Sequence, residues 1–234
     1  MRYMALTVVL AVLAGCSGMR GPVPEDDLRT TKRVGIVSTL GGSTYGVYRG
    51  VTVFNNAGFV APVPEWQIDK FVTDTALTLL RSNPRFEIAP LDLPPGYTSL
   101  SPTEKDAVLW PAAKQQRFDR LLILSPGVSD NFAMYRPGYG LFEMSLFGLP
   151  RYCMYVAYVA SVYDVATQKR LGWEWGGPQP CVLSGDGIPF KPKFDDYTDS
   201  EKASMRAQIE ARLSATLPYA LDGVAPRPAS NKSK

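Results

Sequence analysis

Histidine is absent from this chain of 234 residues. It is the most frequent general base and a common ligand of zinc and iron, so its absence excludes Ser-His-Asp and Cys-His catalysis and histidine-based metal sites. No Ser-x-x-Lys motif in a convincing context replaces it. A pair of carboxylates could still support hydrolysis, because their proximity in space is invisible in a sequence. We expect a protein that is not an enzyme and that holds no metal or other cofactor.

Charged blocks and long apolar runs are also missing. The 25 basic residues nearly balance the 22 acidic ones, which gives a formal net charge of +3. Because no basic cluster stands out, nucleic acid is not an expected partner. The hydrophobic share of 45% is ordinary for a globular protein, and the length suffices for one sizeable core.

The first residues follow the order of an export signal. Arg2 supplies a positive charge, an apolar stretch runs from Ala5 to Ala14, and Gly15-Cys16 follows. Such a stretch fits a secretory signal of roughly 7–15 apolar residues and is too short for a spanning helix of about 20. The alternatives are an ordinary signal peptide or a short buried helix with a chance cysteine.

Leu13-Ala14-Gly15-Cys16 resembles the lipobox of bacterial lipoproteins. The resemblance implies that residues 1–15 are a lipoprotein signal peptide and that Cys16 carries a diacylglycerol and an amide-linked acyl chain such as palmitate. In that family an aspartate after the cysteine is associated with retention at the inner membrane, and Ser17 is not an aspartate. The resemblance therefore implies a lipid anchor on the periplasmic face of the outer membrane.

The rest of the chain divides into three parts by composition. Residues 16–32 are polar and rich in glycine and proline, which predicts a lipidated flexible tether. Residues 33–221 are predicted to form one α/β domain, and residues 222–234 a disordered polar tail.

Hydrophobic periodicity predicts the elements of the domain. Apolar and β-branched segments predict strands at 33–39, 47–54, 59–63, 85–91, 119–124, 154–165 and 169–175. Helical spacing predicts helices at 65–82, 101–118 and 198–221, the second opened by the capping box Ser101-Pro102-Thr103-Glu104 and kinked or split by Pro111. This order predicts an α/β fold with a single domain, a mixed β-sheet with helices packed on it and a late antiparallel hairpin.

Residues 125–150 are predicted to form a long loop rich in glycine, proline and aromatic residues. Long structureless loops are uncommon and often functional. The candidate interaction residues are Tyr135, Arg136, Tyr139, Phe142 and Phe147, because aromatic residues and arginine are typical anchors of interfaces. The alternative is a loop folded back over one end of the sheet.

The late hairpin carries a second resemblance. Residues 162–173, with Asp164, Thr167 and the closing Trp173, are similar to a strand-turn-strand segment of periplasmic lipoproteins. These include curli-secretion-like lipoproteins, activators of penicillin-binding proteins and the N-terminal domain of the Tol-Pal translocation protein, which share a small α/β domain. Residues 50–56 and 66–69 are similar to a group of uncharacterised proteobacterial lipoproteins. Neither resemblance implies a specific activity.

Two cysteines remain besides Cys16. If residues 166–168 form the turn of the late hairpin, then Ser161 faces Trp173 and Cys153 faces Cys181. Directly opposed strand residues lie within disulfide range, so a bridge is expected, and Pro178 and Pro180 are the features that could break the ladder before it. Two free buried thiols are the alternative.

Three further patterns each have two interpretations. The glycine-rich residues 40–46 lack the spacing of a phosphate-binding loop and predict a turn. Trp173 and Trp175 could form a platform for a carbohydrate, although core packing is the simpler interpretation. Asp195, Asp196 and Asp199 could bind calcium, although helix capping explains them better.

The leading hypothesis is a lipid-anchored, non-enzymatic accessory protein of the cell envelope that binds another envelope protein. The alternative is a subunit of a secretion or pore-forming assembly in which the 41–63 hairpin or the 135–150 loop enters the membrane. A carboxylate-based cell-wall hydrolase is a third, weaker hypothesis.

Overall fold

The computed structural model describes residues 21–81, 85–97, 100–127, 136–146, 149–176 and 182–224. The predicted signal peptide, Cys16 and Cys181 lie outside these ranges. Within them, no helix is both long enough and apolar enough to cross a membrane.

The protein forms one mixed sheet with helices packed on it, as the sequence predicts. The strands pair in the order β3-β2-β6-β7-β5-β1-β4, and β8 also pairs with β7. Their bounds are β1 (Arg33–Ser38), β2 (Ser43–Arg49), β3 (Ala57–Pro62), β4 (Glu87–Pro90), β5 (Arg120–Pro126), β6 (Gly138–Leu146), β7 (Leu149–Asp164) and β8 (Arg170–Trp175). The helices are α2 (Glu25–Thr30), α3 (Ile68–Leu80), α4 (Pro102–Gln115) and α5 (Asp199–Val224), with short 3-10 turns at Val53–Asn55, Pro64–Trp66 and Phe194–Asp196.

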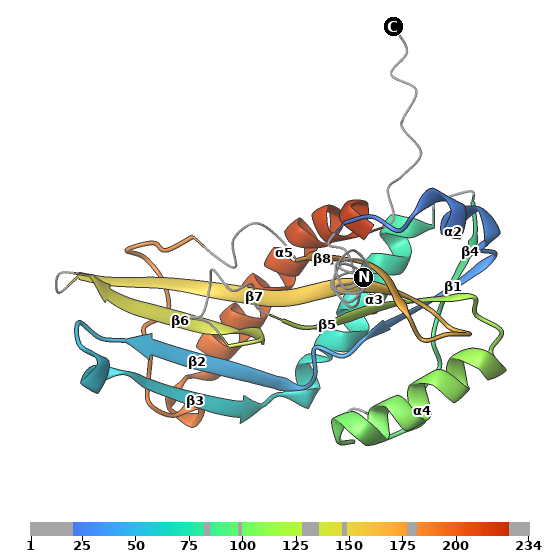
Figure 1. The fold of residues 1–234 in the computed structure, drawn as a ribbon. Coiled ribbons are helices and arrows are strands. Elements are labelled where there is room, and N and C mark those ends of the chain that lie inside the picture. The colour runs from blue at the N-terminus through green and yellow to red at the C-terminus, as the bar shows by residue number, and fades with distance from the viewer. Residues whose placement is uncertain are drawn as a thin grey trace, which may run out of the picture.

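The 16-residue strand β7 joins two parts of the sheet (Figure 1). Its second half pairs antiparallel with β5. β5 pairs in parallel with β1, and β1 pairs in parallel with β4; we call these three strands with their helices the parallel unit. Its first half pairs antiparallel with β6, and β6 pairs in parallel with β2 of the β2–β3 hairpin. The strands β6, β2 and β3 with the first half of β7 form an arm, which extends to the left of the parallel unit in Figure 1.

Alternating side chains of β7 face the two sides of the sheet. The even-numbered residues from Met154 to Val162 enter the main core with α3 and α5. On the opposite face, Tyr163 packs into a second core with Leu109 and Ala113 of α4, and Tyr155 belongs to a third, smaller cluster. The parallel unit therefore has helices on both faces (Figure 1).

Helix α4 begins where the sequence predicts it. The Ser101 hydroxyl accepts a hydrogen bond from the Glu104 amide, and the Glu104 carboxylate accepts one from the Ser101 amide at 2.9 Å. Pro111 lies inside the helix, which continues to Gln115. Of the two predicted effects of Pro111, a kink or a split, the split does not occur.

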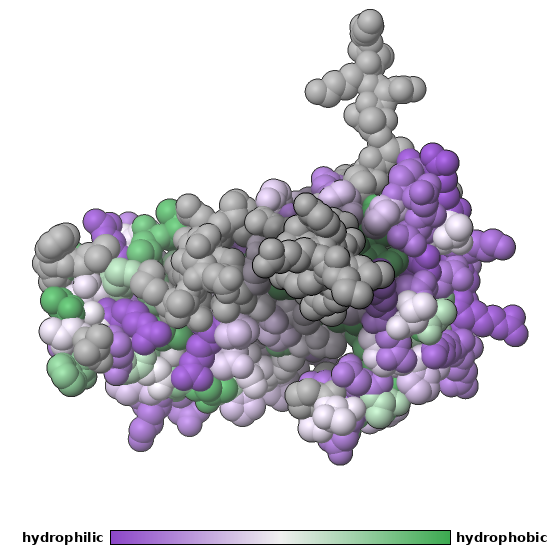
Figure 2. All heavy atoms as spheres, viewed as in Figure 1, coloured by the Kyte–Doolittle hydropathy of each residue, from purple (hydrophilic) through white to green (hydrophobic). Residues whose placement is uncertain are grey.

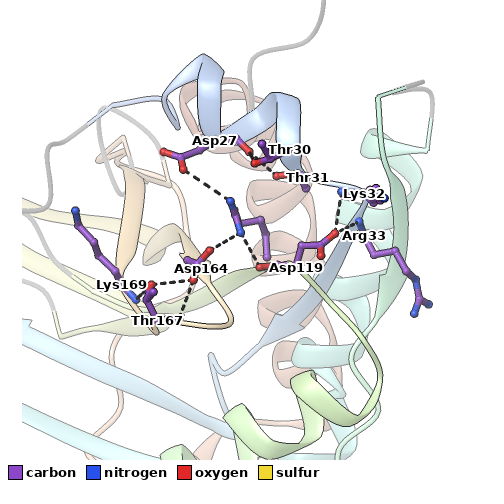
Figure 3. A network of polar contacts seen from close by, with 10 residues as sticks. Asp27, Thr30, Thr31, Lys32, Arg33, Asp119, Asp164, Thr167 and Lys169 are labelled. Carbon is purple, nitrogen blue, oxygen red and sulfur yellow. Dashed lines mark hydrogen bonds and ion pairs between the residues drawn. The ribbon is translucent and has the colours of Figure 1, made fainter.

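Charged side chains tie the amino ends of β1 and β5 to α2 (Figure 3). Arg120 forms ion pairs with Asp164, the last residue of β7, and with Asp27 of α2, the latter at 3.7 Å. Asp119 accepts hydrogen bonds from the amides of Lys32 and Arg33, both at 2.8 Å. Because the Arg120 side chain is only 12% exposed, these carboxylates keep its charge paired inside the fold.

The end of the predicted tether belongs to the folded body. Gly21 pairs with Trp173 of β8, and the side chains of Val23 and Leu28 are buried. Apolar burial and the ion pair of Asp27 hold residues 21–32 against the sheet, so the predicted boundary at residue 33 is wrong. At the other end, α5 continues to Val224, past the predicted end of the domain at residue 221.

Most of the described residues of the predicted loop at 125–150 belong to strands. β5 continues to Pro126, β6 begins at Gly138, and β7 begins at Leu149. The glycines and prolines of this segment hid its strand pattern in the sequence. Gly140 of β6 lies opposite Tyr45 of β2, and an added Cβ there would stand 1.9 Å from the Tyr45 carbonyl oxygen.

Substitution of Gly140 by alanine tests this close approach. We expect Gly140→Ala to lower the free energy of unfolding by about 1–3 kcal/mol, because β2 and β6 must separate to admit a methyl group. Gly185→Ala is the control: it has an ordinary backbone and a nearest neighbour at 3.5 Å, so its change should stay within about 0.5 kcal/mol. Urea unfolding measures both values, and equal stability of the two variants would contradict the assignment.

Asp164 makes stability depend on pH. Burial opposes its ionisation, but hydrogen bonds from Thr167 and the charge of Arg120 outweigh this and lower its pKa. A lowered pKa contributes stability above the unfolded pKa of about 3.9, and this contribution is lost as the pH falls below it. We expect Asp164→Asn to lower the melting temperature at neutral pH, and this difference to shrink as the pH falls below about 4 and through the lowered pKa of Asp164. A difference that is constant with pH would contradict this role.

Candidate functional site

The free end of the arm carries the connections of two neighbouring hairpins. Residues 50–56 join β2 to β3, and the β6–β7 hairpin turns where Leu146 pairs with Leu149. Because β2 and β6 run parallel, both connections lie at the same end of the sheet (Figure 1). We call residues 50–56 together with Leu149 and Pro150 the hairpin tips.

Large apolar side chains are exposed at the hairpin tips. Phe54 is 93% exposed, Val51 70% and Leu149 62%. Hydrophobic residues are visible among polar ones at this end of the molecule in Figure 2. Single exposed apolar residues are common on proteins, but a group projecting from adjacent turns is typical of a surface that contacts another molecule.

Packing within the arm holds the tips in place. Phe59 of β3 stacks on Phe190 at 5.8 Å and also contacts Phe194 and Tyr197. The carboxylate of Glu143 in β6 accepts a hydrogen bond from the Phe190 amide at 2.6 Å. The segment before α5 therefore supports the hairpins, and the tips project from a packed sheet.

A basic row lies directly behind the tips. Arg49 of β2 pairs with Met144 of β6, and Met144 pairs with Arg151 of β7. Residues paired across strands point to the same face of a sheet, so the two arginines flank Met144 on one face. From the free end of the arm inward, the apolar side chains of the tips therefore come first and the two arginines follow.

The tips are far from the point where the described chain enters the fold. Gly21 pairs with Trp173, and Trp173 pairs with Ser161 of β7. About 12 residues of β7 separate Ser161 from Leu149, which corresponds to about 40 Å along the strand. The arm therefore separates the tips from the N-terminal segment.

Two residues of the predicted interaction loop are core residues. Tyr139 and Phe142 are fully buried in β6, and the Tyr139 hydroxyl donates to the Gly41 carbonyl oxygen at 2.8 Å. Their selection as interaction residues is wrong, because Tyr139 packs in the main core and Phe142 in the third cluster. Arg136 is exposed and lies 5.9 Å from the ring of Tyr45. Tyr135 and Phe147 lie outside the described residues.

The exposed residues of the tips were missed for a related reason. Val51 and Phe54 fall in the strand that the sequence predicts at 47–54, whereas β2 ends at Arg49. The available signal was Gly50, since a glycine inside a strand pattern often marks an interruption.

The remaining candidates are placed as follows. Cys153 is disulfide-bonded, but its partner lies outside the described residues, so the Cys153–Cys181 pairing stays a prediction. Trp173 and Trp175 are half-buried in perpendicular contact at 5.4 Å, and Arg170 lies over Trp173. Among the described residues no three or more Asp, Glu, Cys or His side chains group as metal ligands, and this range includes the aspartates at 195, 196 and 199.

Comparisons with known proteins find one distant likeness, to a solved structure. No family model matches the chain, and no curated protein matches it. Among solved structures, the chain is similar to a PelC dodecamer from Paraburkholderia phytofirmans, with 10% sequence identity over 85% of this chain and 92% of that chain. The TM-score is 0.27, which does not establish a shared fold.

The cysteine pairing can be tested by mass. In a Cys16→Ser protein, we expect both remaining thiols to resist alkylation until a reductant is added, and reduction to add the mass of two hydrogens. Peptide mapping of the unreduced protein should then recover residues 153 and 181 in one linked fragment. Alkylation of both thiols without reductant would contradict the pairing.

Proposed function

We propose that this chain is a lipid-anchored, non-enzymatic protein of the cell envelope that binds a partner protein through the hairpin tips. Cys16 carries the lipid on the periplasmic face of the outer membrane, and the α/β body presents the arm. No cofactor takes part in this function.

Exposure of Phe54 at the end of a packed arm is the observation that carries the proposal. Burying a side chain such as Phe, Val or Leu contributes about 1.5–3 kcal/mol, so the three exposed residues of the tips provide a compact apolar anchor. Aromatic anchors of this kind dominate the binding energy of many interfaces. A partner with an apolar groove would bury them and would be positioned by the two arginines behind them.

The position of the tips favours a protein partner over the membrane that holds the anchor. The chain from Cys16 to Gly21 can span at most about 17 Å when fully extended. The tips lie about 40 Å along β7 from the level of Gly21. A body that stands up from its lipid anchor therefore presents the tips to another envelope component, whereas a body lying flat would bring them to lipid.

The second candidate function is a subunit of a secretion or pore-forming assembly whose tips enter the membrane. The basic row of Arg49 and Arg151 behind the apolar tips supports it. Positive side chains near an anionic lipid surface contribute about 1 kcal/mol each, while apolar side chains enter the acyl boundary.

Site-specific photo-crosslinking tests the proposal in cells. We expect a photo-reactive amino acid at position 54 to give a defined adduct with one envelope protein, and the same amino acid at position 219 to give none. Tyr219 is the matched control, because it is exposed and aromatic but lies on α5. The double variant Val51→Ser, Leu149→Ser should abolish the adduct without lowering the melting temperature, since neither side chain is buried.

Vesicle flotation separates the two candidate functions. We expect the non-lipidated Cys16→Ser protein to remain unbound to vesicles that contain anionic phospholipid. Flotation that Phe54→Ser abolishes would instead support insertion of the tips into a membrane and contradict the protein-binding proposal. Equal adducts from positions 54 and 219 would also contradict it.

A further inference from the structure

The parallel unit has the topology that places ligands at one edge of a sheet. β1 lies between β4 and β5, and all three strands run parallel. The connection from β1 to β4 includes α3 on one face of the sheet, and the connection from β4 to β5 includes α4 on the other. In such sheets, ligands bind outside the carboxyl ends of the strands where the connections diverge. Here that point lies between the ends of β1 and β5.

A cavity runs from this point along the sheet face of β5 and β7 that α4 covers, and it reaches Tyr163 and Gln168 near the amino end of β5. Its volume is about 640 Å³, within the range of about 300–1,000 Å³ that is typical of small-molecule sites. In Figure 2 the atoms of α4, at the lower right, stand apart from the body of the molecule. The side chains that line it include Thr39, Tyr97, Trp110, Ser125, Tyr163 and Gln168.

The turn after β1 already contains an anion. The Asp69 carboxylate accepts hydrogen bonds from the Ser38 hydroxyl at 2.6 Å and from the Gly41 amide at 3.1 Å. In nucleotide-binding proteins of this topology, the amides of this turn bind a phosphate. Because Asp69 occupies those donors with its own negative charge, a phosphate or nucleotide is disfavoured. Burial, the largest influence, raises the Asp69 pKa, which indicates that negative charge is costly at this point.

Asp69 does not line the cavity itself, and apart from Lys105 and Asp106 the lining side chains are uncharged. Trp110 and Tyr163 are half-buried and meet at 5.6 Å with an angle of 64° between their rings. The hydroxyls of Thr39 and Ser125 and the amide of Gln168 surround the same cavity. Tyr97 also lines it, and burial together with Asp106 raises its pKa to about 12, so its hydroxyl stays protonated at neutral pH.

This combination matches the surface of a sugar. A pyranose ring has a face of C–H groups that packs on an aromatic ring and a rim of hydroxyls that pairs with neutral donors and acceptors. The lining residues Lys105 and Asp106 carry opposite charges, so they add no net charge that would select a charged ligand.

We propose that the cavity between α4, β5 and β7 binds a neutral oligosaccharide, with Trp110 and Tyr163 against the sugar rings. This site is separate from the hairpin tips and does not depend on the partner proposed for them. It also differs from the Trp173–Trp175 pair, where Arg170 lies over Trp173 and the two rings are perpendicular.

Calorimetric titration with a tetramer of N-acetylglucosamine and with maltotetraose tests the site, and inorganic phosphate is the charged counter-probe. We expect at least one tetrasaccharide to bind and phosphate not to bind. Trp110→Leu should weaken the affinity at least about tenfold, the loss that corresponds to about 1.4 kcal/mol. Trp173→Leu is the matched control, because it removes a second half-buried tryptophan outside the cavity and should leave the affinity unchanged.

Ser125→Ala separates binding from folding, because it removes only a hydroxyl from a half-buried position. We expect it to weaken binding several-fold while the melting temperature stays unchanged. Failure of both tetrasaccharides to bind would overturn the proposal. So would a loss of binding in Trp173→Leu with full binding in Trp110→Leu and Ser125→Ala, or phosphate that competes with the sugar.

Discussion

The continuity of β7 is the constraint on which the rest of the structure depends. Its first half is an edge partner of β6, and its second half pairs with both β5 and β8. Val156 and Val162, near the two ends of the buried run, enter the same core with α3 and α5. Because one unbroken strand and one core span both parts, the arm cannot rotate against the parallel unit without breaking backbone pairing. The arm is therefore a stiff extension rather than a mobile loop.

This stiffness fixes the separation between two ends of the molecule. The described chain enters beside β8, where Gly21 pairs with Trp173 and Arg120 holds α2 through Asp27. The apolar tips lie at the opposite end of β7. A long strand separates the N-terminal segment from the hairpin tips with few residues, because each residue adds about 3.3 Å and no further core is required.

The sequence predicts most of the parallel unit, and in the arm it predicts the β2–β3 hairpin and most of β7 but misses β6. The β-branched run at 33–39, the apolar run at 121–124 and the stripe Met205, Ile209, Leu213, Leu217 each form the predicted element, because periodicity reports a buried face directly. In the β7–β8 hairpin, Ser161 faces Trp173 as predicted. A register shift between Val162 and Tyr163 brings Arg170 rather than Leu171 opposite Tyr163, and a local bulge of this kind leaves no mark in the pattern.

Strand β6 was missed because its signals depend on neighbours that are distant in sequence. Gly138 and Gly140 look like loop residues, yet Gly140 is needed where β6 passes β2, a contact between segments far apart in the chain. Tyr139 and Phe142 look like exposed anchors for the same reason. Of the residues that are exposed, Phe54 falls in a predicted strand and Leu149 in the predicted loop, and their exposure is apparent only once the ends of β2 and β7 are known. Exposure at the tips is a tertiary property that alternation of residue types does not encode.

Two half-buried carboxylates of this region show how the ends of the parallel strands differ. At the amino ends of β1 and β5, Asp164 faces Arg120, and its pKa is lowered despite burial. At the carboxyl end, hydrogen bonds and the charge of Lys105 do not offset the burial of Asp69, and its pKa is raised. At the first end, hydrogen bonds and the Arg120 charge favour the ionised form of Asp164 and so contribute to stability. The second end retains this burial cost at a hollow that Ser38, Asp69 and Tyr97 line, and Tyr97 also lines the cavity proposed for the sugar.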